Sequence, residues 1–283
     1  MIDISNIKIY EPSISEREKL NISWPNYEFL RLAKIENVTY FVKPIDIQCY
    51  INTKIFEELA KKIDLLCCQS LICSENDDSL LALSQSLFSI SNGSYTFMGN
   101  ILAEKEIERV DNSCLIHRMT VVSNQFTRKK YADNTFRELI QYFPSMLVSK
   151  YLKMIALDLY LGQKDRHQNN MQINTETGDL APLYDNELCL LDKNVWFYYN
   201  EVGDEIDIYC NPLIVVQNTK RGICDLLEDY PDMIKIFNIL LETDFSSIIK
   251  SIIEIDGIKL KNSLFDLYLK EEEDIKKFYK SIL

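Results

Sequence analysis

The first hundred residues contain short runs in which apolar and polar side chains alternate, a pattern typical of β-strands. The runs 29–35 and 38–43 flank the dipeptide Glu36-Asn37 and predict a β-hairpin. Pro44 is expected to end the second strand, because proline has no amide hydrogen to donate to a ladder. Two further runs, 79–88 and 95–98, predict additional strands.

The pattern changes to helical spacing in one early segment and in most of the later chain. Apolar residues recur every three or four positions over 51–65, 134–143 and 146–161, and the same spacing continues through 222–283. The order of elements therefore predicts an α+β protein. Its small β-rich N-terminal lobe would span residues 1–100, and its larger α-helical C-terminal lobe would span residues 101–283.

The composition argues against several classes of protein. The 283 residues include 31 Lys and Arg against 43 Asp and Glu, giving a net charge of −12. This balance argues against direct nucleic-acid binding and against an anionic membrane surface. The eight Cys form no C-x-x-C pair, so reduced thiols in a cytoplasmic protein are expected. Neither an N-terminal signal segment nor an apolar run of membrane-spanning length is found.

The most informative motif follows the predicted helix 146–161. Asp165, His167 and Asn170 form a D-x-H-x-x-N run, and Asp185 follows fifteen residues later. The segment 171–180 between them predicts a strand, a turn at 177–179 and a returning strand. This hairpin would bring Asp185 back toward Asn170, and such a set of carboxylates and an amide suits phosphoryl transfer. Polar loops also contain these residue types, which keeps a simple surface turn as the alternative.

A lysine at the end of the predicted hairpin offers a second candidate. Lys43 closes the apolar run Phe41-Val42, and a strand lysine binds the α- and β-phosphates in kinase-type sites. An edge-strand lysine that points to water is the alternative.

Together these residues resemble the HipA-like serine/threonine kinases, whose pattern is roughly N-x-D-x-H-x-x-N followed by L-A-P-x-Y-D. The resemblance implies a two-lobed, protein-kinase-like fold in a compact, kinase-core-only member. It implies that Asp165 is the catalytic base, with His167 bracing the loop. It also implies Asn170 and Asp185 as Mg²⁺ ligands and Lys43 as the phosphate lysine.

Two features depart from that family pattern. The family's phosphate loop usually carries glycine, whereas residues 12–19 contain none; Ser13 and Ser15 there are candidates for phosphate binding or autophosphorylation, with a solvated polar turn as the alternative. The acid expected to pair with Lys43 is also unclear. Glu57 and Glu58 lie on the predicted helix, but the family spacing places this acid within 49–53, where none exists.

The sequence therefore predicts an ATP- and Mg²⁺-dependent kinase that phosphorylates serine or threonine in a protein substrate. A regulatory partner resembling an antitoxin is also expected. One alternative is a catalytically weak pseudokinase that serves as a binding module. A second is a phosphatidylinositol-type lipid kinase, because Asp165-Arg166-His167 also resembles the D-R-H-x-x-N of those enzymes. Their metal motif ends in D-F-G, however, in place of Tyr184-Asp185-Asn186.

Overall fold

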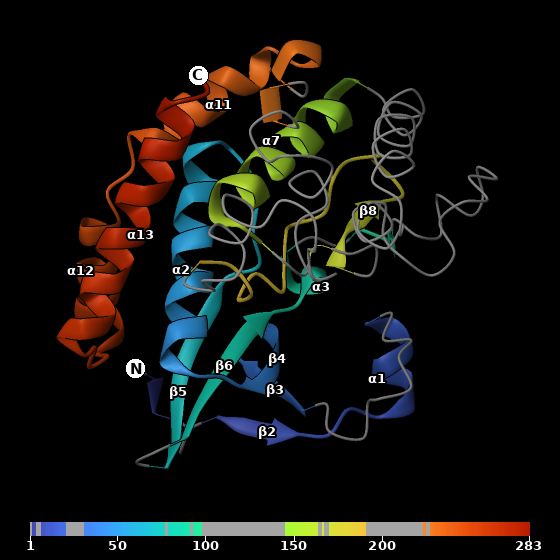
Figure 1. Ribbon diagram of the computed structural model, residues 1–283. Helices are drawn as coiled ribbons and strands as arrows, with labels where there is room; N and C mark the ends of the chain where they lie inside the picture. The colour runs from blue at the N-terminus through green and yellow to red at the C-terminus, as the bar shows by residue number, and fades with distance from the viewer. Residues whose placement is uncertain are drawn as a thin grey trace, which may run out of the picture.

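The computed structural model describes residues 2–3, 7–20, 31–76, 79–90, 93–97, 145–163, 166, 170–190, 223–224 and 227–283. These residues form a six-stranded sheet, a two-stranded sheet and several helices (Figure 1). Neighbouring strands of the large sheet run antiparallel, except that the first strand pairs in parallel with the fifth. In spatial order its strands are β1 (Ile2–Asp3), β5 (Ser70–Asn76), β6 (Ser79–Gln85), β4 (Val38–Pro44), β3 (Arg31–Ile35) and β2 (Lys8–Tyr10).

The predicted β-hairpin is present as β3 and β4. Ile35 pairs with Val38, so the connection is the expected dipeptide Glu36-Asn37. Glu36 has a φ of 54°, a left-handed conformation that this tight reversal imposes on a residue with a side chain. Pro44 is the last residue of β4, as its missing amide hydrogen predicts.

The strand predicted over 79–88 is wrong at its C-terminal end. β6 stops at Gln85, and the short helix α3 (Leu87–Ile90) follows at once. Its hairpin partner β5 was not predicted. Within β5 the apolar residues Leu71, Ile72 and Cys73 are consecutive, so they lack the alternation that identifies a half-buried strand.

Helix α2 (Ile47–Lys62) is displaced by a few residues from the prediction of 51–65. It begins earlier because Asp46 caps it, with Oδ1 accepting from the Cys49 amide at 2.7 Å. It ends earlier because Asp64 takes a left-handed φ of 57°. Its buried residues Ile51, Ile55 and Phe56 belong to the main hydrophobic core.

Four further helices share a hydrophobic core with α2. They are α7 (Ser145–Leu161), α11 (Asp232–Leu241), α12 (Phe245–Asp256) and α13 (Asn262–Lys280). In Figure 1 the blue helix α2 lies between α7, in green, and the orange and red pair α12 and α13. One continuous core joins all five helices. The β-rich part of the chain therefore supplies a helix to the core of the helical part.

The predicted helices agree with the structure to different degrees. The prediction over 146–161 is confirmed by α7, and that over 134–143 lies outside the described residues. The helical prediction over 222–283 overlooks three breaks. Tyr230 and Pro231 precede α11, residues 242–244 separate α11 from α12, and Gly257, at a φ of 64°, ends α12. Glycine is the residue that takes this left-handed cap at least cost.

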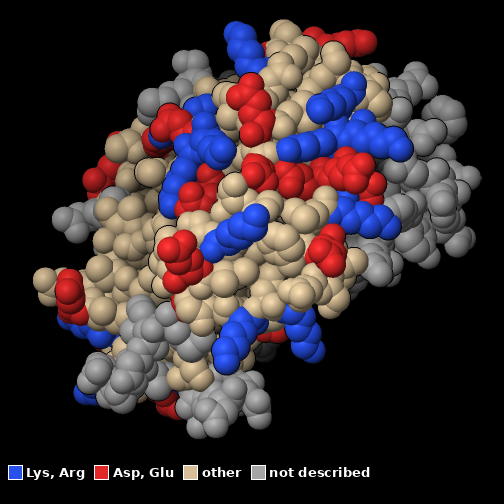
Figure 2. Space-filling view, turned by 90° about the vertical axis from the view of Figure 1, so that its left-hand side faces the viewer, with Lys and Arg blue, Asp and Glu red and all other residues tan. Residues whose placement is uncertain are grey.

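Figure 2 shows the face of the molecule on which α12 and α13 lie, and acidic and basic side chains interleave across it. Helix α13 alone carries the acidic run Glu271–Asp274 and the basic residues Lys276, Lys277 and Lys280. Such a mixed surface provides no single-sign field for a polyanion. Among the described helices, none combines the length and apolar character needed to cross a membrane.

Glu271 on α13 supports a prediction about stability. Burial, together with the nearby Asp274 carboxylate, raises the pKa of Glu271 to about 6 from 4.5. The folded state therefore holds this proton more tightly than the unfolded state, and stability falls as pH rises from about 4.5 through 6. At pH 7, Glu271→Gln is expected to raise the free energy of unfolding by about 1 kcal/mol.

Urea unfolding at pH 7 and at pH 4.5 checks this expectation. The gain should shrink toward zero at the lower pH, where wild-type Glu271 is largely protonated. The exposed neighbour Glu273 gives the matched control, Glu273→Gln. An equal effect of both variants at both pH values would contradict the prediction.

Candidate active site

Lys43 lies at the end of β4 and reaches a pair of carboxylates from a distant part of the chain. Its Nζ lies 2.7 Å from Oδ1 of Asp185 and also donates to Oε1 of Glu187. Burial of Lys43 opposes its charge, but the two carboxylates outweigh burial and raise the pKa of its ammonium group. Lys43 therefore stays cationic at any physiological pH, as a phosphate-binding lysine must.

Asp185 is held in a conformation that residues with side chains seldom adopt. Its φ is 54°, in the left-handed region that aspartate and asparagine tolerate better than most residues. The buried side chain of Gln163 donates from Nε2 to the Asp185 carbonyl at 3.3 Å. Gln163 lies two residues after the end of α7, so the helix end contributes to the position of the Asp185 backbone. Local strain of this kind persists where the surrounding structure holds it, and such positions cluster at functional sites.

Arg166 ties together the chain segments that carry the predicted metal ligands. From one guanidinium, Nη1 donates to the carbonyl oxygens of Asn170 at 3.3 Å and Tyr184 at 3.1 Å. Nη2 donates to Oδ1 of Asn186 at 2.6 Å. The backbone around Asn170 and the backbone around Asp185 are thus bonded to the same side chain.

The charge of Arg166 is balanced by Asp158 of α7. Both side chains are fully buried, and Arg166 Nε lies 3.1 Å from Oδ2 of Asp158. The guanidinium also lies over the Phe56 ring of α2, 5.4 Å from its centroid. A buried arginine with this many partners has a rigid geometry, because its donors form a planar fork. The site is therefore built on α7 and α2, two helices of the main core.

The structure brings together some predicted site residues and leaves others unplaced. Lys43 and Asp185 are in contact, and buried Asn170 is linked to the Asp185 segment through Arg166. Asp165 and His167 lie outside the described residues, so their predicted roles stay predictions.

The hairpin predicted over 171–180 is present, but little strand pairing joins its two sides. Strand β8 (Gln172–Asn174) pairs with β7 (Tyr95–Phe97), and the returning segment contributes a single bridge between Ile173 and Leu180. The turn lies at 175–177, two residues before the predicted position. The strand predicted over 95–98 is confirmed by β7, which supplies most of the pairing that the returning segment was expected to provide.

The glycine-free segment 12–19 is a short helix rather than the expected loop. Helix α1 spans Ile14–Lys19, and Ser13 caps it: the Glu16 amide donates to Ser13 Oγ, and the Ser13 amide and hydroxyl donate to Oε2 of Glu16. Ser15 is exposed on its first turn. To bind a phosphate, Ser13 would have to give up its bond to Glu16.

Neither acid considered on α2 pairs with Lys43. Glu57 is fully buried, and its carboxylate accepts from Lys54 Nζ at 2.7 Å and from the Ser70 amide at 2.8 Å. Glu58 pairs with Lys61 on the outer side of the helix. The acid that sequence reasoning missed is Glu187, two residues after Asp185. The D-x-E spacing was visible in the sequence, but only the fold shows that it faces Lys43.

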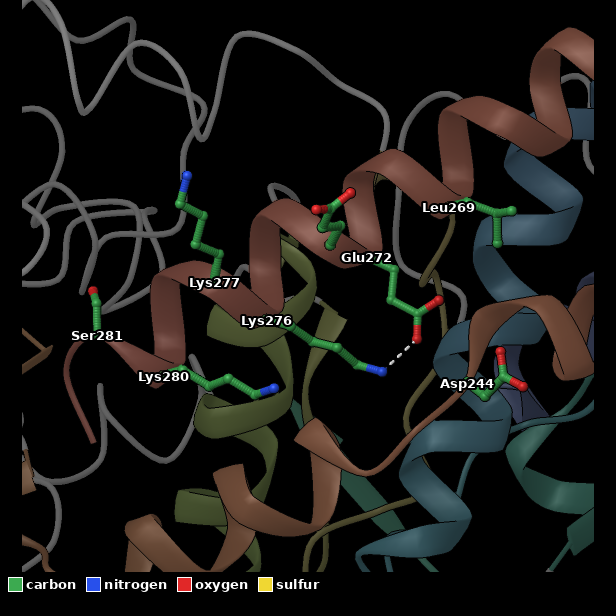
Figure 3. A pocket seen from close by; sticks show the side chains of 8 residues that line it. Asp244, Leu269, Glu272, Lys276, Lys277, Lys280 and Ser281 are labelled. Carbon is green, nitrogen blue, oxygen red and sulfur yellow. Dashed lines mark ion pairs between the residues drawn. The ribbon is translucent and has the colours of Figure 1, made fainter.

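A shallow hollow lies along the C-terminal half of α13, and neither Lys43 nor Asp185 lines it. Figure 3 shows Glu272, Lys276 and Lys280 on one side of it and Asp244 on the other. Lys276 Nζ pairs with Oε1 of Glu272 at 2.7 Å and also donates to the Thr243 carbonyl between α11 and α12. These bonds hold α13 against the connection between α11 and α12. We therefore interpret the hollow as part of the packing between these helices.

Comparison with known proteins supports the fold. No protein-family model and no curated protein matches the chain. Among solved structures, the Helicobacter pylori proinflammatory kinase CtkA is similar over 100% of this chain and 99% of its own, with a TM-score of 0.50 and 17% identity. HipA, in the HipA, HipB and operator DNA complex of Shewanella oneidensis MR-1, is similar over 95% of this chain and 71% of its own. Its TM-score is 0.46, at 13% identity.

At these identities the similarity establishes the architecture and leaves the chemistry to the residues of the site. The predicted α+β class is confirmed, with a small β-rich N-terminal lobe and a larger helical C-terminal lobe. The chain therefore has the two-lobed, protein-kinase-like fold that the sequence predicts.

Proposed function

We propose that this protein is an ATP- and Mg²⁺-dependent kinase that transfers the γ-phosphate to a serine or threonine hydroxyl of a protein substrate. One observation carries the proposal: Lys43 contacts Asp185 across 142 positions of sequence. A cation from the β-rich lobe thus meets the candidate metal ligand from the helical lobe. Phosphoryl transfer depends on such positioning and on electrostatic stabilisation of the transferred group.

Each candidate residue has a distinct role in this reaction. Lys43 binds the α- and β-phosphates, and its strengthened basicity keeps the charge in place. Asp165 orients the attacking hydroxyl and accepts its proton, while His167 braces the loop. Ser13 and Ser15 are proposed to contact phosphate or to receive it in autophosphorylation.

The donor chemistry of the site fits Mg²⁺. Asp185 offers carboxylate oxygens and Asn170 an amide oxygen, and Mg²⁺ is usually held by one or two carboxylates together with substrate phosphates. In the described part of the chain, no three His, Cys, Asp or Glu side chains form a group that could hold a metal ion alone. When bound, the metal neutralises charge on the phosphate oxygens.

The overall charge of −12 makes local cations necessary for nucleotide binding. Lys43 provides one at the site itself. We keep the predictions of a protein substrate, an antitoxin-like or regulatory partner and a cytoplasmic location as proposals. HipA was solved together with HipB, which makes a dedicated partner worth seeking in a pull-down with the full chain.

Intact-mass analysis before and after incubation with ATP and Mg²⁺ tests the proposal. The wild-type protein, with a general protein substrate present, is expected to transfer phosphate to itself or to that substrate. The Asp165→Asn/Asp185→Asn double variant should transfer none, and mapping the modified residues tests Ser13 and Ser15. ATP binding without any transfer would favour the pseudokinase. Transfer to phosphatidylinositol vesicles alone would favour the lipid kinase, and absence of ATP binding would overturn the kinase function altogether.

A further inference from the structure

Lys43 takes both of its acidic partners from a single segment. Asp185 and Glu187 lie two residues apart, and their carboxylates meet the same ammonium group. The side chain of Glu187 is the more enclosed, at 22% exposed against 44% for Asp185. One of the two carboxylates is therefore presented outward, and the other is held inside the cluster.

Helix α2 contributes to this cluster through an amide rather than through an acid. Asn52 is buried on α2, and its Nδ2 donates to the Glu187 carbonyl at 3.1 Å and to the Cys189 carbonyl. These bonds hold the backbone on both sides of Leu188. An amide from the part of α2 where the family resemblance places an acid, residues 49–53, thus acts on the main chain that presents Glu187.

Helix α13 orients Asn52 in turn. The buried Tyr268 lies on α13, and its hydroxyl has two acceptors on α2, Asn52 Oδ1 at 2.7 Å and the Gln48 carbonyl oxygen at 3.0 Å. A carboxamide whose oxygen accepts from Tyr268 must present its nitrogen to the Glu187 segment. Figure 1 shows α13 alongside α2, so the C-terminal helix is connected to the lysine cluster through one side chain.

We infer that Glu187 is the permanent partner of Lys43 in place of a helix acid, and that Asn52 and Tyr268 are positioning residues for it. This inference rests on the proposed function. A bound metal needs Asp185, so Lys43 must be held by another group in that state. The carboxylates of Asp185 and Glu187 and the ammonium group of Lys43 together carry one net negative charge, which is available to bind the metal. Without Glu187, Lys43 would have Asp185 alone among the partners described, and it would compete with the metal for that carboxylate.

The Mg²⁺ dependence of ADP binding distinguishes this role from a merely structural one. ADP binding is measured by calorimetry over a series of Mg²⁺ concentrations. Glu187→Gln is expected to raise the Mg²⁺ concentration at half-maximal binding about 10-fold, the scale typical for loss of an outer-shell partner. Glu187→Asp should restore part of the affinity. The control Glu58→Gln removes an acid of the α2 ion pair with Lys61 and should match the wild type.

A tyrosine pair tests the connection to α13. Tyr268→Phe removes the hydroxyl that contacts Asn52 Oδ1 and the Gln48 carbonyl. It is expected to raise the same Mg²⁺ midpoint about 3-fold, less than loss of Glu187 because it acts two contacts away. Tyr50→Phe is the matched control, since Tyr50 is a buried tyrosine whose hydroxyl donates to Asp256 instead. Its midpoint should stay at the wild-type value.

The outcomes separate this inference from the proposed function. If wild-type protein binds ADP and Glu187→Gln shows an unchanged Mg²⁺ midpoint, Glu187 is not the partner and the inference fails alone. If wild-type protein binds no ADP at any Mg²⁺ concentration, the proposed function fails and the inference fails with it. Urea unfolding of each variant, expected near the wild-type midpoint, excludes a loss of fold as the cause.

Discussion

Replacing Arg166 with methionine is expected to lower the free energy of unfolding by about 3–5 kcal/mol, the cost typical of breaking a buried ion pair. The change leaves the Asp158 carboxylate without its buried cation. It also removes the guanidinium donors to the Asn170 and Tyr184 carbonyls and to the Asn186 side chain. Urea unfolding followed by circular dichroism measures the loss.

A second variant separates the effect of the unpaired Asp158 carboxylate from the effect of the lost hydrogen bonds. Arg166→Met/Asp158→Leu removes both buried charges, and it should recover part of the stability because no carboxylate is left unpaired. The two carbonyls still lack their donor, so recovery should be incomplete. A loss below about 1 kcal/mol for Arg166→Met alone would show that the buried pair does not organise this region.

Asp185→Asn is expected to reduce phosphoryl transfer on the order of 10²- to 10³-fold, the scale for removing one group that stabilises the transition state. Asparagine is nearly the same size and tolerates the left-handed φ of 54° at this position. Lys43 keeps Glu187 as a partner. The variant should therefore stay folded while it loses a carboxylate from the proposed metal site.

Asp179→Asn is the matched control for this variant. Asp179 also pairs with a partly exposed lysine, Lys150, but that pair lies at the β8 turn, outside the cluster. The transfer rate, measured at saturating ATP and Mg²⁺ with equal amounts of folded protein, should stay near the wild-type value for Asp179→Asn. Equal losses in the two variants would contradict a specific role for Asp185.

Strands and helices that are specified by residues close together in the sequence could be predicted closely. The hairpin of β3 and β4 follows from alternation on both sides of a two-residue turn, and α7 follows from helical spacing over 146–161. The start of α2 was misplaced because Asp46, which caps it, precedes the apolar pattern. Strand β5 was missed because its apolar residues are consecutive, and only pairing with β6 and β1 reveals it as a strand.

The candidate site likewise has features that the sequence predicts and features that only the fold reveals. By itself, the sequence determined the types of group available: a strand lysine at 43, an amide at Asn170 and a carboxylate at Asp185, in the order that phosphoryl transfer requires. Only the tertiary structure decided the partners, with Glu187 rather than a helix acid on Lys43 and Arg166 as the buried link between segments. Periodicity and motifs reflect neighbours a few positions apart. Contacts across 142 and 144 positions depend instead on how the α2 and α7 helices pack in one core.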